Sequence, residues 1–289
     1  MDHVFENVNM YNHDLQSCRA VFISDLHLGF RLSNASACLE LLNQIQPERL
    51  YLVGDTIDGW RLMHRWFFPS EHQEIIKRLS QMQMAGCEVV LLPGNHDDFL
   101  RHPDFMNVQR SKEHEPIFTE MGEQLKKFKW AEDTIHVTQS GKRLLIVHGD
   151  LFDNVEQRTK GLSVWGSRVF DRILWVLPTK LCHHIRRFFK SVMARPRSIH
   201  KRLKEESLRR ECDGFVYGHI HRPCMEQEES VLSINLGDWV ENESFLVERP
   251  GGSLELINFG KWISTVDPGF SDLEPRPAKD YSPRPGKTA

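Results

Sequence analysis

The sequence predicts an α/β fold in which a parallel sheet is covered by helices. Short apolar runs alternate with stretches of helical periodicity through the first third of the chain, and this alternation is typical of βαβ units. The composition is that of an ordinary globular protein, with 40% hydrophobic and 27% charged residues, which excludes wholesale disorder, collagen and coiled coil. The length of 289 residues fits one large domain or two small ones.

The first third contains three expected strands with a helix between each pair. The strands are expected at 20–24, 50–53 and 87–92, and the helices at about 33–46 and 70–85. Within the first helix, Ala37, Leu41 and Ile45 recur at helical spacing, so one face is apolar and can cover the sheet.

The second half begins with a hairpin and continues into a long helical segment. Strands at 134–138 and 142–147 flank Gln139-Ser140-Gly141, a turn sequence that favours a β-hairpin. Three or four helices fit residues 156–210, where apolar residues recur at helical spacing on both sides of Pro178.

Strands return after that segment, and the chain ends in a proline-rich stretch. These strands are expected at 214–217, 231–235, 244–248 and 253–258. Residues 265–289 contain five prolines and are expected to form a flexible tail outside the main domain.

Residue usage indicates a cytoplasmic protein. No stretch approaches 18 uncharged apolar residues, so no membrane span is expected. The first residues are acidic and polar, unlike a secretory signal. The six cysteines are scattered singly without a CxxC pair, which favours reduced thiols in the core over disulfides or a zinc ribbon.

The charge is distributed unevenly along the chain. The net charge is -3, yet residues 158–210 hold 15 Lys or Arg against only three acidic residues. Such a block favours an anionic partner, such as a phosphate, a nucleic acid or an anionic membrane surface. A solvated helix face is the alternative explanation.

Five short polar clusters follow the expected strands. They are Asp25-Leu26-His27, Gly54-Asp55-Thr56-Ile57-Asp58, Gly94-Asn95-His96-Asp97, His148-Gly149-Asp150 and Gly218-His219-Ile220-His221. In open α/β sheets, ligands bind at the carboxyl ends of strands, and neighbouring glycines let the backbone turn sharply there. One such cluster alone is a weak signal, but five in this order predict a functional site.

The residue types in these clusters predict a metal centre. Imidazole, carboxylate and amide ligands without thiolate suit Mn²⁺, Fe or Zn²⁺ in a hydrolytic site. Seven candidate ligands are too many for one tetrahedral ion, and they fit two ions about 3.5–4 Å apart that share a carboxylate. In Asp-x-His and His-x-His, an extended chain would place alternate side chains on one side, facing one metal.

The ordered motifs resemble those of the calcineurin-like metallophosphoesterase superfamily over about residues 19–260. The resemblance implies a β-sandwich flanked by helices, with a dinuclear site that holds two divalent ions, Mn²⁺ being favoured and Fe or Zn²⁺ the alternatives. By matching positions, one ion would be held by Asp25, His27, Asp55 and His221. The other would be held by Asp55, Asn95, His148 and His219.

The same resemblance implies a mechanism and roles for the remaining motif residues. A metal-bound hydroxide would attack phosphorus in line, and His96 would contact the phosphoryl group or protonate the leaving oxygen. Asp58, Asp97 and Asp150 would orient the ligands, with Asp97 acting on His96. A purely structural role for Asp58 or Asp150 is the alternative.

Within the superfamily, the chain resembles the UDP-2,3-diacylglucosamine pyrophosphohydrolase group of lipid A synthesis, in its longer branch with a GNHD motif. The resemblance implies that residues 156–210 form a helical lid over acyl chains, and that the enzyme sits on the cytoplasmic face of the inner membrane. A lipid-linked nucleotide diphosphate would be the substrate, with Arg61, His64 and Arg65 as candidate phosphate contacts. Well-known members have arginine where this chain has His96.

Three other functions fit parts of the sequence. A phosphodiesterase or phosphatase acting on nucleotides would use the same metal chemistry. A nuclease could use the basic segment, but the aromatic residues of that segment lie on helix-period stripes, so nucleic acid is the less favoured partner. A non-catalytic scaffold should have lost ligands, whereas this chain keeps them all.

Overall fold

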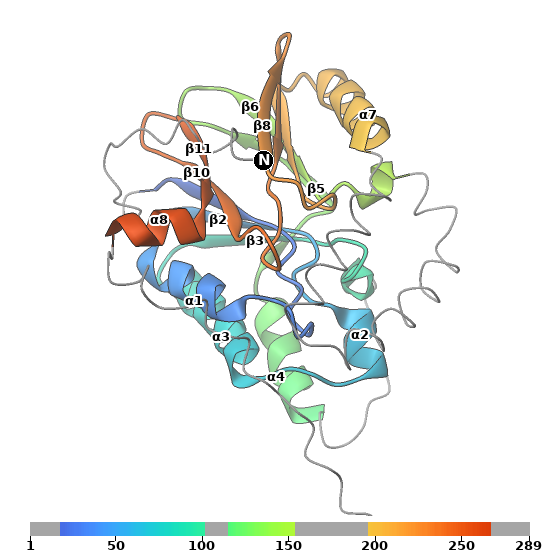
Figure 1. The fold of residues 1–289 in the computed structure, drawn as a ribbon, viewed down its shortest axis with the longest axis vertical. Helices are drawn as coiled ribbons and strands as arrows, with labels where there is room; N and C mark the ends of the chain where they lie inside the picture. The colour runs from blue at the N-terminus through green and yellow to red at the C-terminus, as the bar shows by residue number, and fades with distance from the viewer. Residues whose placement is uncertain (1–17, 102–114, 154–195, 267–289) are drawn as a thin grey trace, which may run out of the picture.

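Two β-sheets packed face to face, with helices on their outer faces, form the centre of the computed structural model (Figure 1). The structure describes residues 18–101, 115–153 and 196–266. The first sheet has the order β11-β10-β1-β2-β3-β4, and the second has the order β5-β6-β7-β9-β8.

Parallel pairing dominates the middle of both sheets. In the first sheet β1, β2, β3 and β4 are parallel, while β10 runs antiparallel to β1 and to β11. Its strands are β1 (Ala20–Ile23), β2 (Arg49–Val53), β3 (Glu88–Leu92), β4 (Lys129–Trp130), β10 (Ser244–Glu248) and β11 (Leu254–Asn258). In the second sheet β6, β7 and β9 are parallel, and β5 and β8 are antiparallel edges. Its strands are β5 (Asp133–Val137), β6 (Arg143–Val147), β7 (Gly214–Tyr217), β8 (Cys224–Glu228) and β9 (Val231–Asn235).

The helices cover the outer faces of this sandwich. Those beside the first sheet are α1 (Ala35–Gln44), α3 (Ser70–Met84), α4 (Glu115–Leu125) and the C-terminal α8 (Phe259–Val266). Helix α7 (Pro196–Arg209) packs on the second sheet, against β7 and β9. The short helices α2 (Gly59–His64), η2 (Asp98–Arg101) and η4 (Asp150–Phe152) follow three of the polar motifs.

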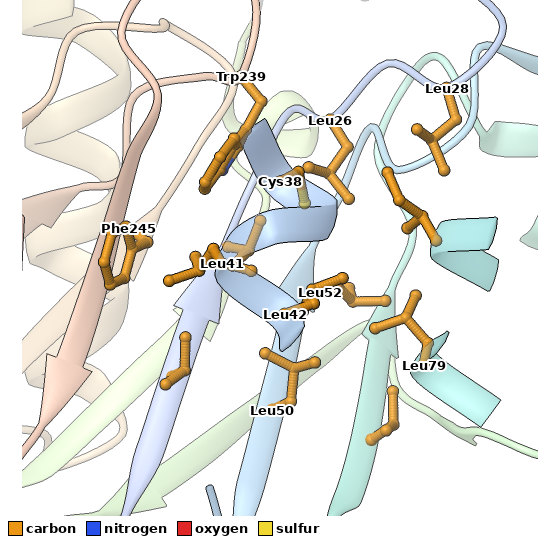
Figure 2. Packing of buried hydrophobic residues seen from close by; sticks show 14 of the residues in the cluster. Leu26, Leu28, Cys38, Leu41, Leu42, Leu50, Leu52, Leu79, Trp239 and Phe245 are labelled. Atoms are coloured by element: carbon orange, nitrogen blue, oxygen red, sulfur yellow. The ribbon is translucent and has the colours of Figure 1, made fainter. Parts of the chain in front are cut away.

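Strand β1 illustrates why the central strands are wholly apolar. Val21 and Ile23 belong to the cluster under the helices, whereas Phe22 belongs to the cluster between the sheets. Because successive side chains point to opposite faces, a strand with helices on one side and a sheet on the other must be apolar at every position. Figure 2 shows the helix side of this core, where Leu41 and Leu42 of α1 pack near Leu50 and Leu52 of β2. Each buried leucine contributes roughly 1.5–3 kcal/mol.

The expected α/β class, the early βαβ units and the hairpin are confirmed, with end shifts of one or two residues at most elements. Strand β8 was not predicted, because its side chains are mostly exposed at a sheet edge and carry no apolar alternation. Helix α2, only six residues long, and helices α4 and α8 were also not predicted. The predicted parallel sheet is only part of the observed structure, because antiparallel strands extend both sheets.

Most of the predicted insertion and tail lies outside the described residues. For the insertion at 156–210, only α7 is described, and it is helical as expected. The boundaries 19–260, 156–210 and 265–289 therefore stay predictions. Among the described residues, no helix is long and apolar enough to span a bilayer. All five described cysteines are free thiols, and four of them are buried.

Candidate metal centre

The five polar motifs meet at one edge of the sandwich, because each follows the carboxyl end of a strand. The loops after β1 and β2 run side by side: the His27 amide donates to the Asp55 carbonyl at 2.8 Å, and the Leu28 amide donates to the Thr56 carbonyl at 2.9 Å. The His148 carbonyl accepts from the Gly218 amide at 3.0 Å, which joins the motifs after β6 and β7. Backbone pairing thus brings distant segments together.

The backbone at the predicted ligands is left-handed, not extended. Asp25, His27, Asp55, His219 and His221 all have φ between 50° and 64°. The expectation of an extended Asp-x-His and His-x-His was wrong, because the strands end at Ile23 and Tyr217, before these motifs. Non-glycine residues in this region cost about 1–3 kcal/mol each, and such strain clusters at functional sites.

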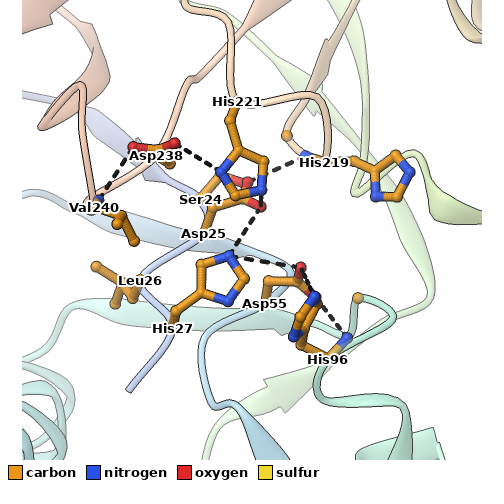
Figure 3. Close-up of polar contacts among 12 residues, drawn as sticks. Ser24, Asp25, Leu26, His27, Asp55, His96, His219, His221, Asp238 and Val240 are labelled. Carbon is orange, nitrogen blue, oxygen red and sulfur yellow. Dashed lines mark hydrogen bonds and ion pairs between the residues drawn. The ribbon is translucent and has the colours of Figure 1, made fainter. Parts of the chain in front are cut away.

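One group of candidate ligand atoms comprises Asp25, His27 and His221, all within 4.8 Å of one another (Figure 3). Asp25 Oδ1 lies 3.1 Å from His221 Nε2 and 3.7 Å from His27 Nε2. Among the described residues, neither Asp25 Oδ1 nor His27 Nε2 has a hydrogen-bond partner of acceptable geometry, although both are buried. Unpaired buried polar atoms are costly, so their convergence fits a site for a cation.

A second group forms on the other side of Asp55. Asn95 Oδ1 lies 3.3 Å from His148 Nε2 and 3.1 Å from His219 Nδ1. Asp55 Oδ1 is 3.5 Å from His148 Nε2, whereas Asp55 Oδ2 is 3.9 Å from His27 Nε2. The two oxygens of Asp55 therefore face the two groups, which is the placement required of a carboxylate shared between two ions.

Hydrogen bonds on the far side of the rings decide which nitrogen is available. His148 Nδ1 lies 2.9 Å from the Val53 carbonyl, which can only accept a hydrogen bond, so the neutral ring carries its proton on Nδ1 and has its lone pair on Nε2, where a metal would bind. Burial would lower the pKa of His148, but the Asp55 carboxylate outweighs it and raises that pKa well above its usual value.

Ser24 orients the Asp25 carboxylate, and this role was not predicted from the sequence. Its hydroxyl contacts Asp25 Oδ2, which also accepts from the His219 amide at 3.1 Å. With Oδ2 engaged, Oδ1 is left facing the imidazoles. A Cβ on Gly218 would collide with both Ser24 and Asp25, which explains why glycine stands there. The sequence signal that could have indicated this role is the hydroxyl residue directly before Asp25 at the end of the strand.

Asp58 links His96 to the metal group. This fully buried carboxylate contacts His96 Nδ1 through one oxygen, and its other oxygen lies 3.3 Å from His27 Nδ1. His96 Nε2 then lies 3.9 Å from Asp55 Oδ2, with about a fifth of the side chain exposed. Burial would lower the pKa of His96, but Asp58 and Asp55 raise it to about 9.

Asp97 does not contact the His96 ring as expected, so that part of the prediction was wrong. Its carboxylate instead accepts backbone amides of Thr56 at 2.7 Å, Asp55 at 3.3 Å and Gly94. It therefore fixes the loop that carries Asp55. Adjacency in sequence was misleading, because the Asp97 side chain turns toward backbone donors of another strand's loop. Burial, together with the nearby Asp55, raises the pKa of Asp97 to about 7.

Asp150 lies beside the centre and pairs with Arg101, which the sequence analysis missed. The Arg101 guanidinium lies 3.1 Å from Asp150 Oδ2 and donates to the carbonyls of Pro93 and Gly94 at 3.0 and 3.1 Å. These contacts tie the loop of Asn95 to the loop after β6. Asp150 thus contacts the guanidinium that binds these backbone carbonyls.

The three candidate substrate contacts lie in or next to helix α2. The Arg61 guanidinium contacts Asp58 and lies 4.1 Å from the centre of the Phe30 ring. Arg65 is exposed. The side chain of His64 is outside the described part of the structure, so all three remain predictions as substrate contacts.

Two further carboxylates, which the motifs did not include, contact the rings of the GHxH motif. Asp238 Oδ2 lies 2.7 Å from His221 Nδ1. Asp153 Oδ2 lies 3.3 Å from His219 Nε2. Buried Trp239 packs against Phe245 in the core.

Comparison with known proteins finds relatives that align with most of this chain. The chain is 25% identical over 256 residues to UDP-2,3-diacylglucosamine hydrolase of Photorhabdus laumondii, an alignment covering 83% of this chain and 98% of that protein. It is also 25% identical over 244 residues to the protein of the same name from Haemophilus influenzae, covering 78% and 93%. The solved phosphoesterase Yfce of E. coli aligns with a TM-score of 0.38 at 16% identity, over 83% of this chain and 98% of that chain.

A family model described as calcineurin-like phosphoesterase matches residues 18–223. That range contains all five polar motifs, from Asp25 to His221. Clustered histidine and aspartate side chains within it form candidate metal-binding groups. This chain therefore belongs to the calcineurin-like phosphoesterase family and is a hydrolase of the metallophosphoesterase type.

Proposed function

We propose that this protein hydrolyses the diphosphate of UDP-2,3-diacylglucosamine to UMP and 2,3-diacylglucosamine 1-phosphate. The observation that carries the hydrolysis is the pair of buried ligand groups that meet at Asp55. The proposed substrate is supported by relatives named UDP-2,3-diacylglucosamine hydrolase, which align with this chain over nearly their whole length.

Seven side chains are proposed to hold two divalent ions. One ion is assigned to Asp25, His27, Asp55 and His221, and the other to Asp55, Asn95, His148 and His219. When bound, such ions lower the pKa of water and stabilise charge on the phosphoryl oxygens. We favour Mn²⁺, since the ligands are imidazole and oxygen donors without thiolate.

His96 is proposed to act on the phosphoryl group. Asp58 engages its Nδ1, so the ring is held with Nε2 toward Asp55 and the centre. From there Nε2–H can donate a hydrogen bond to a phosphoryl oxygen or a proton to the leaving oxygen. Asp58 also contacts His27, so a single carboxylate orients one proposed ligand and the proposed catalytic residue.

Charge and chain position support a lipid-linked diphosphate as substrate. The segment 158–210 carries 15 Lys or Arg against three acidic residues and lies between two metal motifs in the sequence. Basic side chains there would attract a diphosphate and anionic lipid head groups. A position on the cytoplasmic face of a membrane is part of this proposal.

The test compares three substrates with the Mn²⁺-loaded protein: UDP-2,3-diacylglucosamine, an unacylated UDP-sugar and a chromogenic phosphodiester. We expect UMP from the acylated substrate and little from the unacylated sugar, with Asp55→Asn as the blank. Turnover of the simple diester with the lipid untouched would contradict the substrate and favour a phosphodiesterase of small molecules. Because His96 stands where well-known members of the resembled group have arginine, hydrolysis of the simple diester is measured as a separate reaction.

A further inference from the structure

Asp238 lies in the turn between β9 and β10 and is fully buried. Its Oδ1 accepts three backbone amides, from Val240 at 3.1 Å, Glu241 at 2.7 Å and Asn242 at 3.1 Å. Its Oδ2 points the other way and lies 2.7 Å from His221 Nδ1 (Figure 3). The two oxygens therefore have separate tasks, one in the turn and one at the centre.

The contact determines which nitrogen of His221 carries the proton. The carboxylates of Asp238 and Asp25 can both only accept, but Asp238 makes a hydrogen bond at 2.7 Å, whereas Asp25 Oδ1 makes none of acceptable geometry among the described residues. The neutral ring therefore holds its single proton on Nδ1. The lone pair is then on Nε2, which faces Asp25 Oδ1 at 3.1 Å. With the proton on Nε2 instead, the ring would donate to Asp25 and close the space between them to a cation.

The same turn also positions the neighbouring backbone. The Trp239 amide donates to the Asp25 carbonyl at 3.1 Å, and Asn242 Nδ2 donates to the His221 carbonyl at 3.0 Å. The segment that starts at Asp238 is thus attached to both Asp25 and His221, which lie in the loops after β1 and after β7. Their relative placement depends on this turn.

We propose that Asp238 is a positioning residue that holds His221 in the Nδ1–H form and so sets the affinity of the ion shared by Asp25, His27 and His221. The inference rests on the proposed function, in which His221 is a metal ligand. Carboxylates behind metal-bound histidines change metal affinity about 10–100-fold when they are removed. An effect of that size is expected on one of the two ions only.

Asp238→Asn is a sharp test, because the three backbone amides require an oxygen at the Oδ1 position. The new amide nitrogen must then occupy the Oδ2 position, facing His221 Nδ1 with a donor. We expect the ring proton to move to Nε2. Asp133→Asn is the matched control, since Asp133 pairs with Arg210 away from the centre.

Two measurements read out the change. Long-range ¹H–¹⁵N correlation on metal-free, histidine-labelled protein reports the tautomer of His221, assigned with His221→Ala. We expect Nδ1–H in the wild type and in Asp133→Asn, and Nε2–H in Asp238→Asn. Titration with Mn²⁺ by calorimetry should show one of two ions bound about 10–100-fold more weakly in Asp238→Asn, with the other unchanged.

The possible results distinguish the role of Asp238 from the proposed ligand set that includes His221. An Nε2–H ring in the metal-free wild type would overturn the inference, even if the variant did not fold. So would a folded Asp238→Asn that binds both ions within twofold of the wild type, or binds one weakly with its tautomer unchanged. If His221→Ala itself binds both ions normally, the proposed ligand set is wrong.

Discussion

Two buried clusters in this molecule combine histidine with carboxylate, but they differ in how completely their polar atoms are paired. Between the sheets, His136 Nε2 lies 2.6 Å from Glu248 Oε2, and His136 Nδ1 lies 3.0 Å from the Tyr51 hydroxyl. Glu248 Oε1 accepts from Arg19 at 2.9 Å and from the Gln139 amide at 2.7 Å. We call this set of five residues the inter-sheet network.

At the candidate metal centre, the same residue types leave atoms unpaired. Asp25 Oδ1 and His27 Nε2 are buried and, among the described residues, lack a hydrogen bond of acceptable geometry. A complete network joins the two sheets, whereas an incomplete one leaves buried polar atoms at a free-energy cost that a further ligand would remove. A buried histidine–carboxylate contact is therefore not by itself a sign of function, whereas the convergence of several unpaired ligand atoms on one space is.

The largest expected effect is on catalysis, from a change at the metal centre. Asp55→Asn should lower kcat/KM for a chromogenic phosphodiester by about 10³-fold or more, because several kcal/mol of charge stabilisation at the transition state are lost. The free energy of unfolding of the metal-free protein should also fall, because the imidazoles of His148 and His96 outweigh burial and hold the pKa of Asp55 well below its usual value, so the carboxylate stabilises the fold. Steady-state kinetics and urea denaturation measure the two quantities. Near-normal turnover by Asp55→Asn would show that Asp55 is not part of the metal centre.

At the inter-sheet network, a substitution should lower stability alone and leave turnover unchanged. Glu248→Gln leaves His136 and Arg19 without their buried carboxylate and should lower the free energy of unfolding by about 3 kcal/mol. Turnover per folded molecule should stay within twofold of the wild type, because the network is remote from the centre. If Glu248→Gln reduced kcat while stability was unchanged, the distinction between the two clusters would not hold.

An intermediate effect is expected at Asp58, which orients two rings without being a proposed ligand. Asp58→Asn should reduce kcat/KM about 10–100-fold, the range for groups that orient metal ligands. Asp133→Asn serves as the control for removal of one carboxylate. A loss as large as that of Asp55→Asn would show that Asp58 has a direct role.

The smallest effect concerns a third buried histidine, His72, which accepts from the Gly29 amide at 2.9 Å. Burial lowers its pKa to about 4 in the folded state. The unfolded chain, with a histidine pKa of about 6.5, binds more protons, so stability is lost as pH falls below that value. Between pH 7 and pH 6 the free energy of unfolding should drop by roughly 0.7 kcal/mol through this residue.

His72→Asn keeps an acceptor for the Gly29 amide but removes the titration. Urea denaturation of the variant should therefore show a shallower pH dependence than the wild type over this interval. Parallel curves for the two proteins would mean that His72 is not the titrating group.

Much of the fold and of the candidate site could be predicted from the sequence, because both depend on local patterns. Apolar runs identified the central strands, and polar residues after them, such as Asp55 and His148, had to meet where parallel strands end. What could not be predicted arises from contacts between segments distant in the chain. Asp238 reaches His221, and Arg101 reaches Asp150, only after the sheets have assembled.

Local backbone geometry was the other limit. Alternation along a strand applies only while the strand continues, so it gave the wrong conformation for His27 and His221, which lie in left-handed turns. Edge strand β8 carries polar residues on both faces and left no periodic signal.

The central claim is that the unpaired atoms around Asp55 mark a centre for two ions that is required for hydrolysis. Its most direct test is to strip the protein of metal with a chelator and titrate Mn²⁺ back, following bound ions by calorimetry and phosphodiester hydrolysis in parallel. We expect two ions bound per chain, no turnover in the stripped protein, and recovery of activity as the two sites fill. Full hydrolysis by the stripped protein, or saturation of binding at a single ion, would contradict it.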